Sequence, residues 1–212
     1  MDNFITVALP KGKLFKPSAE LLKKVGWSAE NLSDNSRKLV ITNEQDKLNF
    51  IITKTADVTT FVEYGAADIG IIGKDVIAES EKDIFELLDL GFGKCHLMMA
   101  VPKDKLRKNF QDYANTAVAT KFPNIAKKFF DSQAMQMEFI KLNGSIELAP
   151  LIGLTDSIVD IVETGTTLRE NNLVEVVNIM NCTARLIANP VSYKLNFQRI
   201  NQLVQDLRVF RD

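Results

Sequence analysis

Short apolar segments rich in β-branched residues alternate with helical patterns along almost the whole chain, and this alternation limits the folds that the chain can adopt. Residues 4–9 (FITVAL) form one such segment, which Pro10 ends before a helical pattern begins. Residues 157–162 form another, and residues that favour a helix follow it as well. Strands that alternate with helices predict α/β layers with largely parallel sheets. The ligands of such sheets bind beyond the carboxyl ends of the strands.

The same patterns predict the remaining elements. A polar turn joins two strands at residues 37–42 and 48–53, which indicates a hairpin. Further strands are expected at 67–72, 84–90, 96–101, 116–120 and 138–142, with one or two more in 173–188. Helices are expected at 58–64, 76–79 and 123–132. One terminal helix is expected to begin at Asn189-Pro190, because Asn is a good N-cap and Pro suits the first helical position.

Gly91-Phe92-Gly93 separates two groups of these elements and predicts two lobes. The first lobe is expected to comprise residues 1–90 and to be rejoined by about 174–212, because the terminal helix needs a sheet to cover. The second lobe is expected to comprise residues 91–173. Since ligands bind beyond the carboxyl ends of strands, a ligand cleft between the two lobes is expected.

The junction at residues 160–168 (DIVETGTTL) has the composition of a phosphate-binding loop. Backbone N–H groups at the start of a helix attract an anion, and threonine hydroxyls donate further hydrogen bonds. The two acids repel phosphate, but they suit sugar hydroxyls or Mg²⁺, which takes oxygen ligands. Phosphoribosyl pyrophosphate (PRPP) combines all these groups. The candidate residues are Asp160, Glu163, Thr164, Gly165, Thr166 and Thr167. An ordinary turn with a Thr cap and a Gly of positive φ remains the alternative.

Two other strand ends are candidate anion sites. Lys11-Gly12 follows the first strand, and Lys11 can reach a phosphate as a point charge. Gly73-Lys74-Asp75 follows the strand at 67–72 in the same way. A solvated surface lysine would produce the same pattern, so the short motif alone does not decide between the two interpretations.

The composition excludes several classes of protein. A formal net charge of −1 over 212 residues argues against a nucleic-acid partner. Cys95 and Cys182 are too few for a disulfide framework or a structural zinc site, and both are expected to be buried thiols. His96 is the only histidine and is expected to be structural. No apolar run approaches a membrane span and no secretion signal is visible, so a cytoplasmic soluble protein without membrane contact is expected.

Several separate segments, in order along the chain, match one family. They are ALPKGKL (8–14), SRKLVIT (36–42), FVEYGAADIGIIGKD (61–75), GSIELAP (144–150), DSIVDIVETGTTLRENNLV (156–174) and ARLIANPVSYK (184–194). The chain resembles the catalytic subunit of ATP phosphoribosyltransferase in its short form. This resemblance implies two lobes similar to those of type II periplasmic binding proteins. It also implies transfer of phosphoribosyl from PRPP to N1 of ATP with Mg²⁺ as cofactor, the first step of histidine biosynthesis.

The resemblance implies roles for individual residues. PRPP is expected to bind Glu147, Asp160, Glu163, Thr164, Gly165, Thr166 and Thr167, and ATP is expected to bind Lys11, Gly12, Arg37, Lys54, Gly73 and Asp75. No single catalytic acid or base is implied. Transition-state stabilisation is expected from Asp160, Glu163 and Lys11, with Mg²⁺ held through substrate phosphates and by Asp160 or Glu163. The implied partner is a regulatory subunit similar to histidyl-tRNA synthetase, and self-association is also expected.

Two positions depart from the family pattern. Lys13 stands where the family often has Arg, so the planar bidentate fork is lost. Thr59 stands where Pro is common. Two alternatives remain open on sequence alone: a type I phosphoribosyltransferase that acts on a free nucleobase, and a solute-binding protein without catalytic activity on the same two-lobed fold.

Overall fold

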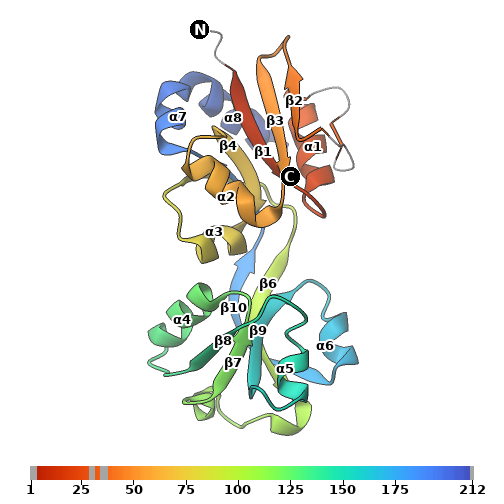
Figure 1. The fold of residues 1–212 in the computed structure, drawn as a ribbon, viewed down its shortest axis with the longest axis vertical. Helices are drawn as coiled ribbons and strands as arrows, with labels where there is room; N and C mark the ends of the chain where they lie inside the picture. The colour runs from red at the N-terminus through yellow and green to blue at the C-terminus, as the bar shows by residue number, and fades with distance from the viewer. Residues whose placement is uncertain (1–3, 29–31, 34–37, 211–212) are drawn as a thin grey trace. The chain divides into compact units, whose positions relative to one another are not determined.

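The chain divides into two compact units. The computed structural model describes residues 4–28, 32–33 and 38–210. Unit 1 comprises Met1–Gly93 and Thr183–Asp212, and unit 2 comprises Lys94–Cys182 (Figure 1). The chain was expected to return to the first lobe at about residue 174. It returns at Thr183 instead, because residues 173–182 pair within the sheet of unit 2.

Unit 1 is built on a six-stranded sheet with the order β2-β3-β1-β4-β11-β5. Its strands are β1 (Ile5–Pro10), β2 (Val40–Asn43), β3 (Leu48–Thr53), β4 (Ile69–Gly73), β5 (Phe85–Asp89) and β11 (Ala184–Ala188). The central strand β1 runs parallel to both β3 and β4. The hairpin β2–β3 and the pairs β4–β11 and β5–β11 are antiparallel. The sheet is therefore mixed, and only its centre has the parallel arrangement expected from the sequence.

Helices cover both faces of this sheet. One face packs against α1 (Phe15–Lys24) and α8 (Phe197–Val209) through the larger core of the unit. The opposite face packs against α2 (Thr55–Glu63) and α3 (Lys74–Ser80) through a smaller apolar cluster. The predicted N-cap at Asn189 is confirmed, since its side chain accepts hydrogen bonds from the amides of Val191 and Ser192 at the start of α7 (Pro190–Leu195).

Unit 2 contains a five-stranded sheet with the order β10-β6-β9-β7-β8. Its strands are β6 (Cys95–Pro102), β7 (Ala117–Thr120), β8 (Glu138–Lys141), β9 (Ser157–Val162) and β10 (Leu173–Cys182). Strand β7 is parallel to β8 and β9, whereas β6 is antiparallel to β9 and β10. Its helices are α4 (Pro123–Ser132), α5 (Leu148–Leu151) and α6 (Thr166–Glu170), with 3-10 turns at Lys103–Lys105 and Phe110–Tyr113.

Three expectations about the elements were wrong in detail. Both sheets are mixed, because strands that leave or return to a unit run against their neighbours. Helix α2 begins at Thr55, three residues earlier than expected, with Lys54 as its N-cap. The single terminal helix is two helices, α7 and α8, which meet at Asn196. None of the helices in the described ranges is long and apolar enough to cross a membrane.

Candidate functional site

Three predicted residues of unit 1 lie at the carboxyl ends of neighbouring parallel strands. Lys11 follows β1, Lys54 follows β3, and Gly73 ends β4. The Lys11 amide donates to the Thr53 carbonyl at 2.8 Å, which holds the ends of β1 and β3 side by side. Because β1 is parallel to both neighbours, these three positions lie at one edge of the sheet.

Lys11 and Lys54 line one pocket of about 540 Å³ at this edge. The apolar part of its lining includes Val40 from β2, Ile51 from β3 and Phe61 from α2. Asp57 also lines it, from the first turn of α2. The pocket therefore offers two cations, one carboxylate and an apolar wall. This is a suitable lining for a ligand that joins an aromatic ring to phosphates.

Gly73 and Asp75 lie one strand further along, at the start of α3. The Asp75 carboxylate occupies the space that a Cβ at residue 73 would take, so a larger residue at 73 would require the Asp75 side chain to move. Burial raises the pKa of Asp75, and hydrogen bonds from its own amide and that of Val76 oppose the increase. Neither residue is in the lining of the pocket at Lys11. Gly12, the residue after Lys11, has a φ of +88°, and an added Cβ there would meet no heavy atom within 4 Å.

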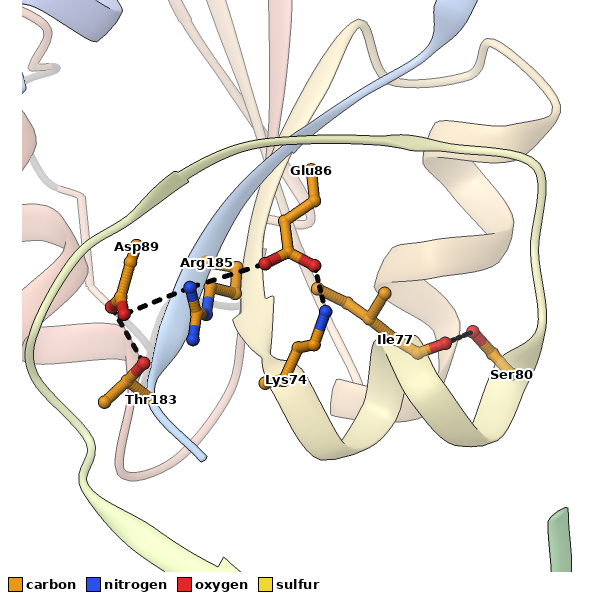
Figure 2. A network of polar contacts seen from close by, with 7 residues as sticks. All are labelled: Lys74, Ile77, Ser80, Glu86, Asp89, Thr183 and Arg185. Carbon is orange, nitrogen blue, oxygen red and sulfur yellow. Dashed lines mark hydrogen bonds and ion pairs between the residues drawn. The ribbon is translucent and has the colours of Figure 1, made fainter. Parts of the chain in front are cut away.

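A chain of polar contacts fixes the start of α3 within unit 1 (Figure 2). Lys74 forms an ion pair with Glu86 on β5, and its amide donates to the Thr183 carbonyl at 3.0 Å. Arg185 on β11 lies 3.4 Å from Glu86 and 3.0 Å from Asp89. The Thr183 hydroxyl donates to the same Asp89 at 2.8 Å. The contacts join α3, β5 and β11, and so hold the backbone on which Gly73 and Asp75 are placed.

The parallel strands of unit 2 bring the second group of candidates to one edge of its sheet. Asp160 lies near the carboxyl end of β9, and Lys121 directly follows β7. Burial is the main cause that raises the pKa of Asp160; the positive charge of Lys121 opposes the increase and the negative charge of Glu147 adds to it. Asp160, Lys121 and Glu147 are therefore close enough to interact electrostatically. A half-buried carboxylate with a raised pKa is typical of a functional site.

The loop between β9 and α6 and the first two residues of α6 carry the remaining predicted residues. Glu163, Thr164, Thr166 and Thr167 are exposed, and Gly165 has the left-handed φ of +72°. The hydroxyls of Thr164 and Thr166 lie 3.2 Å apart. Because these groups are close to one another and exposed to solvent, the loop presents several hydrogen-bond donors to one ligand.

Arg169 supports this loop from α6. Its guanidinium donates to the Thr164 carbonyl at 3.3 Å and to the Thr166 hydroxyl at 3.2 Å. The side chain thus places a positive charge beside a loop predicted to bind phosphate. Sequence reasoning missed both Arg169 and Lys121. Lys121 could have been found, because it follows a strand as Lys11 does.

The predicted residues therefore form two groups, each within one unit. Lys11 and Lys54 share a pocket in unit 1, while Asp160 and Glu147 interact in unit 2. Arg37 lies outside the residues that the structure describes. Across residues 4–28, 32–33 and 38–210, no three His, Cys, Asp or Glu side chains gather as a group that could hold a metal ion.

Comparison with solved structures defines the class of protein. A periplasmic sulfonate-binding protein from Methylobacillus flagellatus KT has a similar fold, with a TM-score of 0.65, 14% identity, and coverage of 99% of this chain and 68% of that one. At this identity the similarity concerns the fold alone. The chain is a two-lobed α/β protein with the fold of periplasmic binding proteins, as the family resemblance implied.

The family follows from closer similarities. A family model described as ATP phosphoribosyltransferase (HisG) matches residues 54–209. The ATP phosphoribosyltransferase of Desulfitobacterium hafniense (strain Y51) is 51% identical over 213 residues, which cover 97% of this chain and 96% of that protein. A chain of the ATP phosphoribosyltransferase HisG:HisZ complex from Thermotoga maritima matches with a TM-score of 0.82 and 31% identity over 98% of both chains. The chain belongs to the ATP phosphoribosyltransferase family.

Proposed function

We propose that the chain joins C1 of PRPP to N1 of ATP, which gives phosphoribosyl-ATP and releases pyrophosphate, the first step of histidine biosynthesis. Membership of the family supports the activity. The observation that carries the site assignment is the edge of the unit 2 sheet. There Asp160, Lys121 and the loop around Gly165 combine a carboxylate, a cation and hydroxyl donors at the ends of parallel strands.

Unit 2 is proposed to hold PRPP. The amides and hydroxyls of Thr164, Thr166 and Thr167, together with the Gly165 amide, bind the 5-phosphate, which is dianionic and accepts several hydrogen bonds. Arg169 contributes positive charge from the side of the loop that it already contacts. Asp160, Glu163 and Glu147 face the ribose hydroxyls or Mg²⁺.

Mg²⁺ is proposed as the cofactor, and the donor set suits it. Asp160 and Glu147 interact electrostatically and both supply carboxylate oxygens, the ligand type that Mg²⁺ takes. Mg²⁺ usually binds through one or two carboxylates together with substrate phosphates. When bound, Mg²⁺ would supply positive charge to the pyrophosphate group. Asp160 would then be held in its ionised form, which burial disfavours.

Unit 1 is proposed to hold ATP. Lys11 and Lys54, both in the lining of the same pocket, bind its phosphates, and Val40 and Phe61 provide an apolar surface for the purine. Arg37, Gly12, Gly73 and Asp75 complete the proposed ATP site. Lys11 is also proposed to support the transition state, because a positive charge stabilises the negative charge that develops on a departing pyrophosphate.

The reaction requires little acid–base help from these residues. Adenine N1 already has an unprotonated lone pair, and pyrophosphate leaves as positive charge develops at C1. The residues act by orienting N1 towards C1 and by stabilising the charges of the reacting phosphates. Lys121 and Lys11 supply positive charge, while Asp160 and Glu163 hold the sugar. No nucleophilic side chain is needed.

A regulatory subunit resembling histidyl-tRNA synthetase is proposed as partner, with self-association of the catalytic chain and a cytoplasmic location. The similar Thermotoga maritima chain comes from a HisG:HisZ complex, which supports the first part of this proposal. Measuring mass by light scattering for the chain alone and with the candidate partner tests it. A catalytic chain that stays monomeric and does not bind the partner would contradict it.

The activity is tested by following pyrophosphate release with PRPP and either ATP or free nucleobases. Release only with ATP supports the proposal. Release only with a nucleobase would identify a type I phosphoribosyltransferase, and no release with either would favour a binding protein that does not catalyse the reaction.

The site is tested by three substitutions. Glu163→Ala and Thr166→Ala should weaken PRPP binding in calorimetry, and Lys54→Ala should raise the KM for ATP. Lys16→Ala is the matched control, because Lys16 is an exposed lysine on α1 whose side chain lies 3.9 Å from Glu20. Wild-type PRPP affinity in both unit 2 variants, or an unaltered KM in Lys54→Ala, would remove those residues from the site.

A further inference from the structure

The two cysteines of the chain lie directly opposite each other at one end of a strand pair. Cys95 begins β6 and Cys182 ends β10, and the antiparallel register of these strands pairs Cys182 with Cys95. The chain enters unit 2 at Lys94 and leaves it after Cys182. The two cysteines therefore lie where each of these strands connects to unit 1 along the chain.

The backbone geometry of such a pair allows a disulfide. Directly opposed residues in an antiparallel ladder have Cα atoms about 4.5–5.5 Å apart and side chains on the same face. Disulfides span Cα distances of about 4.4–6.8 Å. Both residues are thiols in the structure. Since the pair is the last one in the ladder, the strand ends can adjust to bring the Cβ atoms to bonding distance.

The two thiols differ in their access to solvent. Cys95 is half-buried, whereas Cys182 is 2% exposed and donates to the Met180 carbonyl at 3.8 Å. His96 and Asn181, the next pair of the ladder, point to the opposite face because side chains alternate along a strand. The face with the cysteines therefore carries two thiols of unequal access, without the histidine that a mixed metal site would need.

We propose that Cys95 and Cys182 form a reversible intramolecular disulfide that restrains the two connecting strands. The oxidant is a low-molecular-weight disulfide such as glutathione disulfide. The Cys95 thiolate attacks one of its sulfurs, which forms a mixed disulfide and releases one glutathione. The Cys182 thiolate then attacks the Cys95 sulfur and releases the second glutathione, so two protein thiols are oxidised and one disulfide is reduced.

The order of attack follows from exposure, because the more accessible thiol reacts first with a reagent in solution. A bond here would close a loop that contains all of unit 2 between its ends. Such a cross-link stabilises a fold mainly by restricting the unfolded chain. Disulfides of proteins in reducing compartments are usually transient or redox-sensing, and exposed or strained ones are the labile members of the class.

The test uses the full chain and needs no substrate, so its outcome is independent of the proposed function. The protein is equilibrated in glutathione buffers from fully reduced to fully oxidised, and remaining thiols are alkylated and counted by mass spectrometry. We expect both thiols to be lost together in the oxidised buffers, without added glutathione mass, and to be recovered with dithiothreitol. Amide exchange at 95–97 and 180–182 should be slower in the oxidised form.

Two variants test the order of attack. Cys182→Ser should stop at a mixed disulfide between Cys95 and glutathione, whereas Cys95→Ser should remain unmodified while folded and react only in denaturant. Retention of both thiols in the oxidised buffers, a disulfide between two chains, or unchanged amide exchange would overturn the proposal. Equal reactivity of the two folded variants would overturn the assigned order.

Discussion

Replacing Gly165 by alanine raises the free energy of the backbone conformation in the loop between β9 and α6. It removes no group that is proposed to contact PRPP. Gly165 has a φ of +72°, in the left-handed region where a Cβ crowds the backbone. An added Cβ would also lie 3.3 Å from the Arg169 guanidinium, a flexible side chain that can move by a few tenths of an ångström. The backbone strain is therefore the main effect.

That strain determines the size of the expected change. A left-handed alanine costs ~1–2 kcal/mol relative to glycine. If the unliganded loop of the variant relaxes out of the left-handed conformation, PRPP binding has to supply this free energy to restore that conformation. The PRPP affinity should then fall by about 5–30-fold, the range that corresponds to this free energy. Gly165→Asn should lose less, because asparagine tolerates the left-handed region.

Calorimetry with PRPP measures the affinity, and urea unfolding measures the stability. Gly153→Ala is the matched control: Gly153 has a φ of +75°, lies in unit 2 outside the proposed site, and its added Cβ would meet nothing within 4 Å. We expect Gly153→Ala to bind PRPP like the wild type. The reasoning is refuted if Gly165→Ala also binds PRPP with wild-type affinity.

Three further substitutions test the packing and electrostatics. Asp160→Asn should raise the thermal unfolding midpoint at neutral pH. Burial raises the pKa of Asp160 in the folded protein above its value in the unfolded chain. The stability of the wild type therefore falls as the pH rises between these two pKa values, whereas that of Asp160→Asn does not. A difference in unfolding midpoint between the two proteins that does not grow with pH would contradict this. Gly70→Ala should cost ~1–3 kcal/mol in urea unfolding, because its Cβ would lie 3.0 Å from two buried valine methyls of α2. Gly144→Ala, whose Cβ would meet nothing within 4 Å, is its control, and equal unfolding midpoints would refute the packing argument. Thr59→Val should stabilise by ~1 kcal/mol in the same assay, since the buried Thr59 hydroxyl has no hydrogen-bond partner in the described part of the chain; a loss of stability would count against it.

The elements with strong local signals could be predicted from the sequence. Strand β9 at Ser157–Val162 and helix α4 at Pro123–Ser132 have the predicted bounds. A continuous apolar run marks the strand, and a proline marks the start of the helix. The antiparallel hairpin β2–β3 followed from its polar turn, although the expected start of β2 at Arg37 lies outside the described residues.

Strand direction could not be predicted in the same way. Residues 184–188 have the apolar composition of a buried strand, but composition does not say whether a strand runs with or against its neighbours. β11 is antiparallel to both β4 and β5, a pairing between segments far apart in the sequence. The break at Asn196 was also missed, because the apolar pattern on either side of it continues the spacing of one helix.

The candidate site could be predicted where a motif is continuous and was missed where it depends on folding. The loop around Gly165 is a single segment, and its composition indicates phosphate binding. Lys121 lies about forty residues earlier, and its relation to Asp160 depends on the parallel pairing of β7 with β9. The contact of Arg169 with the Thr164 carbonyl was not predicted, because composition does not show which turn a helical arginine contacts.

The position of β11 between β4 and β5 affects the order in which the chain can fold during synthesis. Strands β1 to β5 leave the ribosome first, but among the described strands β5 pairs only with β11, which is made after the whole of unit 2. Unit 2 is one continuous segment, so all its strand partners are present before Thr183 is made. Domains generally fold as units when their residues are available. The later unit in the sequence is therefore expected to fold first, while the nascent first unit keeps an unpaired edge at β4 until residues 184–188 emerge.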